Sequence, residues 1–178
     1  DLVSTNKYVI PLLNKRYIFI KSSRGCIHEC IFCITPFYSG NLIRERSTRN
    51  VLEEIRYVNS IGINDVVFYS DVFTYNKRFV NDLCKKLIQH GIKINWMCNS
   101  RVDTVEDEML KAMKKSGCWM ISYGIESLNQ KILDKNKKNT TLIQISNAIK
   151  LTKKNNIIVM GFFILGLDGE DEDSVRKT

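Results

Sequence analysis

The stretch at residues 51–69 reads VLEEIRYVNSIGINDVVFY and contains one complete helix–turn–strand unit. Val51, Ile55 and Val58 recur at helical spacing, so the first half predicts an amphipathic helix. Gly62 follows as a terminator, because glycine adopts the left-handed conformation of a helix C-cap at little cost. The apolar run at 66–69 comes next and predicts a short buried strand.

The same unit recurs along the rest of the chain. Each helical stripe ends at a glycine or an asparagine, and a continuous apolar run follows it. These runs lie at 92–97, 119–123 and 157–164, and a first strand is expected at 17–21. Continuous apolar runs are typical of parallel strands that are buried on both faces. The pattern predicts an α/β fold, a partial TIM-like (β/α) barrel of about five parallel strands with outer helices.

The composition is that of an ordinary globular chain with a basic surplus. Hydrophobic residues make up 44% of the 178 residues, and the net charge is +8 at a pI of about 9.2. The lysines are scattered over predicted helices, with one denser patch at Lys131, Lys135, Lys137 and Lys138. Scattered lysines set only non-specific attraction to polyanions, so an RNA-binding module remains the less favoured alternative.

No segment has the features of a membrane span or a secretory signal. The longest apolar stretch, at 157–167, contains Gly161 and Gly166 and fits a buried strand with its exit loop. The start of the chain lacks the pattern of a signal peptide. We therefore expect a cytoplasmic protein without a membrane partner.

The six cysteines form two groups. Cys84, Cys98 and Cys118 stand singly in apolar segments, and we expect them in the core because free cysteine is often buried. The other three lie in the loop after the first strand, which reads RGCIHECIFC at 24–33. Without a secretory context, this C-x3-C-x2-C spacing favours a metal or redox role over a disulfide framework.

Cys26, Cys30 and Cys33 suit an iron–sulfur cluster. Three thiolates can bind three irons of a [4Fe–4S] cube and leave the fourth iron open to a ligand that offers an amine and a carboxylate. The alternative is a structural zinc site, which needs a fourth ligand. The chain has two histidines, and the short tether of His28 between two of the cysteines makes joint ligation awkward.

Residues 23–33 resemble the signature loop of the radical S-adenosylmethionine (SAM) superfamily. Further segments resemble those of the family in the same order, namely SDVFT at 70–74, NSRVD at 99–103, YGIES at 123–127 and GFFILGLDGE at 161–170. The resemblance implies that the three cysteines bind a [4Fe–4S] cluster. It also implies an enzyme that cleaves SAM reductively and generates a 5′-deoxyadenosyl radical.

The resemblance also implies which residues hold the nucleoside of SAM. Phe32 would pack near the adenine, and the backbone around Ile164 and Gly166 would flank it. Glu126 would accept hydrogen bonds from the ribose hydroxyls. The family pattern has a proline where this chain has Asp168.

Three charged residues are implied at the mouth of the barrel. Asp71 would accept a hydrogen bond from the amine of SAM, and Lys137 would meet its carboxylate. Arg101 would point toward the same mouth. Two alternatives stay open, because Asp71 could instead cap the following turn, and Arg101 could form a salt bridge with Asp103 or Glu106. The family pattern has an acid at the position of Ser70 and a glycine at that of Lys138.

Within the superfamily, the segments at 70–74 and 123–127 favour the branch that carries a cobalamin-binding domain. The expected cofactors are then the cluster, SAM and a cobalamin bound by a domain outside this chain. The stretches at 33–36 and 44–47 resemble the tRNA methylthiotransferases, which is the alternative branch. Expected partners are an unidentified substrate and a low-potential electron donor such as flavodoxin or ferredoxin.

The resemblance also suggests a domain organisation. Residues 1–16 would be a lead-in segment, and 17–178 would be the core barrel. The family barrel has six units, so a (β/α)6 barrel that is truncated at its C-terminal side is expected here. In such a barrel the functional residues belong on the loops after the strands, where the quoted segments fall.

Overall fold

Five parallel strands form the centre of the molecule, as the sequence predicts. The computed structural model describes residues 9–10 and 15–178. Its main sheet has the order β1-β2-β5-β6-β7-β8, in which every neighbouring pair from β2 onward is parallel. The strands are β1 (Val9–Ile10), β2 (Lys15–Ile20), β5 (Asp65–Phe68), β6 (Asn95–Ser100), β7 (Cys118–Glu126) and β8 (Ile158–Phe163).

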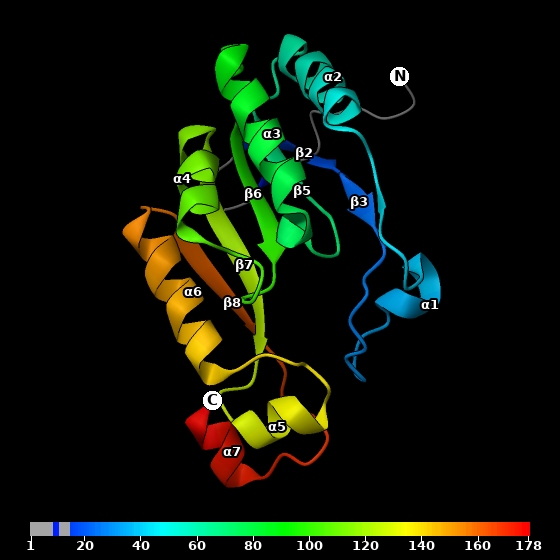
Figure 1. Ribbon diagram of the computed structural model, residues 1–178, viewed down its shortest axis with the longest axis vertical. Coiled ribbons are helices and arrows are strands. Elements are labelled where there is room, and N and C mark those ends of the chain that lie inside the picture. Colours follow the sequence, from blue (N-terminus) through cyan, green and yellow to red (C-terminus); the bar gives the residue numbers. More distant parts are fainter. Residues whose placement is uncertain (1–8, 11–14) are drawn as a thin grey trace.

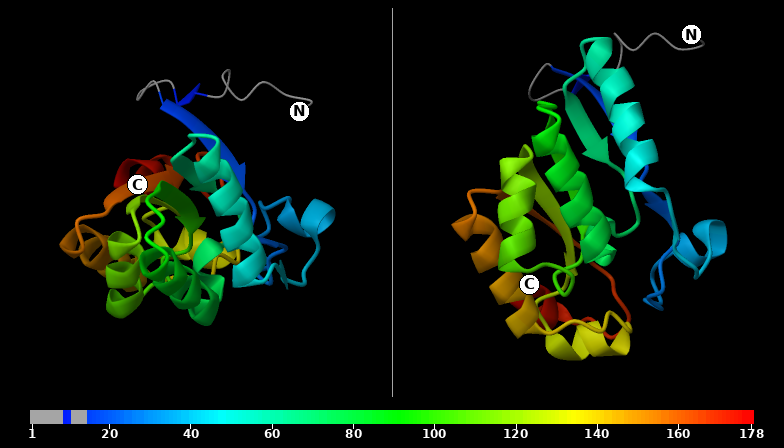
Figure 2. Two further views of the ribbon diagram at one scale, coloured as in Figure 1. Left: turned by 90° about the horizontal axis from the view of Figure 1, so that it is seen from above. Right: turned by 45° about the horizontal axis from the view of Figure 1, so that its top comes forward.

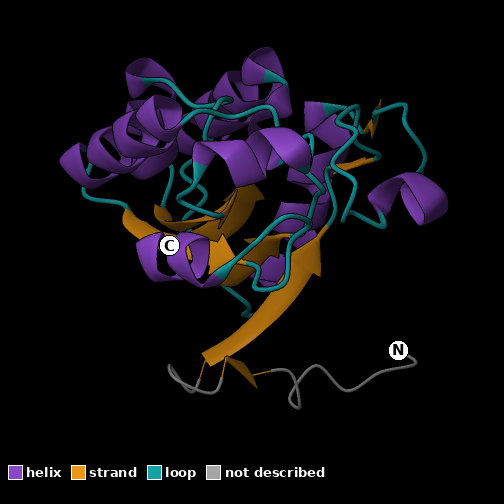
Figure 3. Ribbon diagram, turned by 90° about the horizontal axis from the view of Figure 1, so that it is seen from below, coloured by secondary structure: helices purple, strands orange, loops and turns teal. Residues whose placement is uncertain are grey.

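The long helices cover one face of this sheet, as Figures 1 and 3 show. Side-chain caps define where three of them begin: Ser47 accepts from the backbone of Asn50, Asn76 from that of Arg78, and Thr141 from that of Gln144. Such caps satisfy donors that the first turn leaves unpaired. The four helices are α2 (Thr48–Ser60), α3 (Lys77–Gln89), α4 (Asp107–Lys115) and α6 (Leu142–Lys154).

The shorter elements gather at the carboxyl ends of the strands. They are β3 (Ser23–Arg24), which pairs with β4 (Arg44–Glu45), a 3-10 turn at Phe73–Tyr75, and the helices α1 (Thr35–Ser39), α5 (Gln130–Lys135) and α7 (Glu172–Lys177). Figure 1 shows α5 and α7 beyond the lower end of the sheet and α1 beside the segment that follows β3. These elements surround the loops on which the functional residues were expected.

The core lies between the sheet and the helix layer. Trp96 and Tyr123 are fully buried there, and the Trp96 indole donates to the carbonyl of Ser116. Cys84, Cys98 and Cys118 belong to the same core, which confirms their expected placement. Burial raises the pKa of Cys84 to about 12 and that of Cys98 well above its usual value, so both thiols stay protonated.

The sheet stays open at both edges in the described part of the chain. No pairing joins β8 to β1 or β2 among residues 9–10 and 15–178, so the strands form an incomplete barrel. Two further views in Figure 2 show the curved sheet and the helix layer on its outer side. Most of the expected lead-in segment, 1–16, lies outside the described residues.

The observed strands differ from the predicted ones mainly at their ends. The strand expected at 92–97 begins at Asn95 instead, because Ile92 donates its N–H to the carbonyl of Leu87 and so still belongs to the turn that ends α3. The strand expected at 119–123 extends to Glu126. In the part of the chain that the structure describes, no helix is both long and apolar enough to cross a membrane.

Candidate active site at the carboxyl ends of the strands

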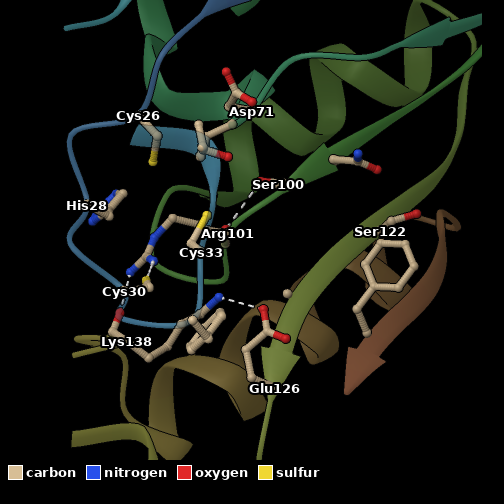
Figure 4. A pocket seen from close by; sticks show the side chains of 16 residues that line it. Cys26, His28, Cys30, Cys33, Asp71, Ser100, Arg101, Ser122, Glu126 and Lys138 are labelled. Atoms are coloured by element: carbon tan, nitrogen blue, oxygen red, sulfur yellow. Dashed lines mark hydrogen bonds and ion pairs between the residues drawn. The ribbon is translucent and has the colours of Figure 1, made fainter. Parts of the chain in front are cut away.

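A cavity opens where the carboxyl ends of the strands meet the loop that carries the three clustered cysteines. Its empty volume is about 700 Å³, which includes space open to solvent. Figure 4 shows the side chains that line it. Seven of the residues singled out by sequence line this one cavity, namely Cys26, Cys30, Phe32, Cys33, Asp71, Arg101 and Glu126.

The cysteine loop is fixed at its start by Gly25. This residue has a φ of 98°, and a Cβ atom there would lie 2.1 Å from the carbonyl oxygen of Leu42. Its N–H donates to Asp71 Oδ2 at 2.8 Å. The next residue, Cys26, donates its N–H to the carbonyl of Gly40 at 3.3 Å. Glycine is required here because no other residue fits so close to the neighbouring backbone.

The three thiols are free and face one cavity. Burial is the main cause that raises the pKa of Cys26, and the thiols of Cys33 and Cys30 raise it further. The N–H of His28 and the charge of Arg101 act in the opposite direction. Within the described residues, no three side chains among His, Cys, Asp and Glu converge closely enough to hold one metal ion. A cubane cluster spreads three thiolates over three irons, so this donor set fits it.

Asp71 contacts the cysteine loop directly. One of its carboxylate oxygens accepts the N–H of Gly25, and the side chain lines the cavity. The preceding residue, Ser70, accepts from the backbone N–H groups of Ser22 and Ser23 at 3.1 Å each. The SDVFT segment therefore joins the ends of β2 and β5 and holds the start of the loop.

Arg101 is buried and forms the salt bridge with Asp103, which was one of the two alternatives expected from the sequence. It donates to both carboxylate oxygens of Asp103 at 2.9 Å and to the carbonyl of Lys138 at 2.9 Å. Glu106, the other alternative, pairs with Lys77 instead. The remaining nitrogen of the guanidinium, Nη1, lies 3.8 Å from Cys30 Sγ and donates toward it. Arg101 thus places a fixed positive charge beside one of the three thiols.

Glu126 ends β7 in an unusual backbone conformation. Its φ is 69°, and the pairing with β8 shifts register between Gly124 and Glu126. A residue other than glycine in this region is strained, and such strain concentrates at functional sites. The carboxylate is buried and accepts from Lys138 Nζ at 2.9 Å (Figure 4). The backbone N–H of Ile164 donates to the Glu126 carbonyl at 3.0 Å.

Lys138 reaches the cavity, whereas Lys137 does not. In the sequence, Lys138 is noted only as a residue that replaces a glycine of the family pattern. Lys137 is exposed with a φ of 51°, and Asn139 also has a positive φ of 54°. The two left-handed residues flank Lys138, which is 5% exposed and turns inward. Its Nζ lies 5.9 Å from the centre of the Phe32 ring. The expected carboxylate contact at Lys137 therefore has no support from the geometry.

Ile164 and Gly166 do not line the cavity, although the backbone N–H of Ile164 is hydrogen-bonded to the Glu126 carbonyl. Their neighbour Phe162 lines it instead. Sequence reasoning also missed His28 and Ser122, which both line the cavity and carry buried polar atoms without a partner among the described residues. The available signal for Ser122 was a serine inside the apolar run at 119–123.

Comparison with known proteins agrees with this geometry. Residues 20–178 match the family model described as the radical SAM superfamily. An uncharacterized methyltransferase of Pyrococcus horikoshii is 35% identical over 100% of the chain and 39% of its own length. The anaerobic magnesium-protoporphyrin IX monomethyl ester cyclase of Cereibacter sphaeroides is 30% identical over 99% of the chain and 30% of its own length.

Solved structures show the same fold. The methyltransferase TsrM of Kitasatospora setae, with cobalamin and a [4Fe–4S] cluster bound, has a TM-score of 0.83 at 18% identity and covers 92% of the chain. The cobalamin-dependent SAM radical enzyme OxsB, with aqua-cobalamin and SAM bound, has a TM-score of 0.80 at 20% identity and covers 91% of the chain. The chain spans 33% and 26% of these two structures. With the family model matched over almost its whole length, this chain belongs to the radical SAM superfamily.

Proposed function

We propose that this chain is the core of a radical SAM enzyme that serves a cobalamin-dependent methyl transfer to an unidentified substrate. The observation that carries the proposal is the single cavity that Cys26, Cys30 and Cys33 share with Phe32 and Glu126. A [4Fe–4S] cluster on the three thiolates would supply one electron to SAM, and cleavage of the C–S bond would release methionine and a 5′-deoxyadenosyl radical.

The residues around the cavity have complementary tasks in this proposal. Glu126 accepts hydrogen bonds from the ribose hydroxyls, and Phe32 packs against the adenine. The second oxygen of Asp71 accepts from the amine. Lys138, rather than Lys137, is the cation available to the carboxylate of SAM, because its ammonium group reaches the cavity.

Arg101 contributes through charge and not through direct contact with SAM. Its guanidinium is held by Asp103 and donates toward Cys30 Sγ. The charge of Arg101 lowers the pKa of Cys26, in opposition to burial, and so favours the thiolate that a metal requires. Arg101 is thus a positioning residue for the cluster.

The relatives support methyl transfer as the reaction. They include the bacteriochlorophyllide d C-12(1)-methyltransferase of Chlorobaculum tepidum, which is 29% identical over 89% of the chain. A putative methylthiotransferase of Methanocaldococcus jannaschii, 31% identical over 87% of the chain, keeps methylthio transfer as the second candidate. Either reaction needs a low-potential electron donor, for which flavodoxin or ferredoxin is proposed, and a cytoplasmic location is consistent with both.

The proposal is tested by anaerobic reconstitution. The protein is loaded with iron and sulfide, reduced with dithionite and given SAM, and 5′-deoxyadenosine is measured by chromatography. We expect release by the unaltered protein, loss of iron and of release in Cys30→Ala, and normal iron content in the core variant Cys84→Ala. A protein that holds iron without cleaving SAM, or a Cys30→Ala variant that still cleaves it, would contradict the proposal.

A further inference from the structure

The inner face of the sheet is arranged in layers that the strand register defines. Gly124 pairs with Phe162 nearest the cavity mouth. In the next layer Asn99 pairs with Ser122, and Ser122 pairs with Met160. Since side chains alternate along a strand, the same face continues two residues further down each strand.

The layer of Ser122 contains a buried polar group without a partner among the described residues. The Ser122 side chain is fully buried, and its hydroxyl has no hydrogen-bond partner among residues 9–10 and 15–178. Asn99 lines the same cavity and is half-buried, so its carboxamide is available to a ligand there. A buried hydroxyl without a partner costs free energy, so a ligand that satisfies it gains affinity and specificity.

The next layer down is apolar. Met97 pairs with Val67 on one side and with Met120 on the other, and Met120 pairs with Ile158. Ile158 is 58% exposed although it lies within a strand. The inner face thus continues, beyond the residues that line the cavity, into a layer of apolar side chains. Methionine side chains adapt to irregular ligands because they are unbranched and polarizable.

Ser122 is separated from the groups assigned to SAM. Figure 4 shows it across the cavity from Cys26 and His28, on β7 and away from the cysteine loop. The ribose hydroxyls, the amine and the carboxylate of SAM have partners in Glu126, Asp71 and Lys138 under the proposed function, and none of these groups is assigned to the hydroxyl of Ser122. A molecule that bonds to this hydroxyl would lie next to SAM, where a radical or a methyl group could reach it.

We propose that Asn99 and Ser122 form the subsite that positions the substrate, and that this substrate is a largely apolar molecule with one amide, carbonyl or hydroxyl group. The polar group bonds to Ser122 and Asn99, and the apolar body rests on the methionine layer beneath. That the bound molecule is the substrate depends on the proposed function, whereas its recognition depends on Ser122, Asn99 and the apolar layer of the inner face.

Two matched probes test the subsite on protein loaded with the cluster and SAM. Benzamide carries the predicted polar group, and toluene has a similar ring without it. Anaerobic equilibrium dialysis should show tighter binding of benzamide to the unaltered protein. Ser122→Ala should weaken benzamide by about three- to tenfold, as expected for one hydrogen bond, and leave toluene unchanged. Ser146→Ala, an exposed serine of α6, is the control and should change neither.

Thermal unfolding separates ligand recognition from a structural role. If the Ser122 hydroxyl serves only a ligand, Ser122→Ala should unfold at the same temperature as the unaltered protein or higher, because it removes an unsatisfied buried group. Equal binding of the two probes, or equal loss of both in Ser122→Ala, would overturn the inference, as would a lower unfolding temperature of this variant. Release of 5′-deoxyadenosine from the same samples tests the proposed function separately: its absence with intact probe discrimination would refute the function and not the recognition.

Discussion

Removing the ammonium group of Lys138 should destabilise the protein more than removal of any exposed cation. Lys138 and Glu126 form an ion pair at 2.9 Å, with side chains only 6% and 9% exposed. Lys138→Met keeps the aliphatic length but leaves the Glu126 carboxylate buried without its partner. Breaking a buried pair in this way typically costs about 3–5 kcal/mol. For a chain of this size that corresponds to a fall in unfolding temperature of roughly 6–20 °C.

The matched control is Lys77→Met. Lys77 pairs with Glu106 at 2.5 Å, but these side chains are 50% and 46% exposed. Exposed pairs are worth about 0–1 kcal/mol, so this variant should be close to the unaltered protein. Urea unfolding of the reduced, cluster-free protein measures both. If Lys138→Met loses no more free energy of unfolding than Lys77→Met, the buried pair does not hold this part of the site together.

A double substitution shows whether the cost comes from the uncompensated charge. Glu126→Gln removes the carboxylate charge that Lys138→Met leaves without a partner. The two changes together should therefore lower the free energy of unfolding by less than the sum of the single changes. The expected coupling is about 0.5–3 kcal/mol, the range for residues in direct contact. Strict additivity would show that the two side chains act independently.

Three further predictions concern the loop and the strand end. Gly25→Ala should abolish iron binding, whereas Gly91→Ala should not, because a Cβ at Gly25 would lie 2.1 Å from the Leu42 carbonyl oxygen and one at Gly91 meets nothing within 4 Å. Iron analysis of both variants checks this, and a normal iron content in Gly25→Ala would contradict it. Gly124→Ala should weaken SAM binding without loss of iron, since the added Cβ would lie 2.4 Å from Glu126 Oε1 and displace that carboxylate. Equilibrium dialysis with SAM tests this prediction, and an unchanged affinity for SAM would refute it. Cluster loading should release protons and become less favourable as the pH falls, because burial raises the pKa of Cys26 and the ligand is the thiolate; pH-independent loading would contradict this.

The fold was predictable because its signals are local. Each helix–terminator–strand unit carries its own apolar period and its own turn residue, as Val51, Ile55, Val58 and Gly62 illustrate. Terminal residues were less predictable, since hydrogen bonds such as that from Ile92 to Leu87 decide where a helix turn ends and a strand begins.

The site was predictable as far as the family segments carry it. The cysteines and Asp71 follow strands in sequence, Glu126 is the last residue of one, and the carboxyl ends of parallel strands meet at one edge of a sheet. What could not be predicted is which way neighbouring side chains point. Lys137 and Lys138 are alike in sequence, and only the left-handed turn around Lys138 turns that residue inward.

Contacts between segments that are distant along the chain could not be predicted from the sequence either. Arg101 reaches both Asp103, two residues away, and Cys30, which is 71 residues away. Local spacing predicted the first partner as an alternative, whereas the second follows from tertiary packing. Likewise, the sequence cannot show that the Ser122 hydroxyl has no hydrogen-bond partner, because this depends on every neighbour on the inner face.

Three cysteines that bind a [4Fe–4S] cluster leave its remaining iron open to SAM. Electron paramagnetic resonance of the reduced, reconstituted protein tests this arrangement most directly, with and without SAM. We expect a cluster signal that changes when SAM is added and that is lost in Cys26→Ala, Cys30→Ala and Cys33→Ala. A signal that SAM leaves unchanged, or one that survives in any of these three variants, would contradict it.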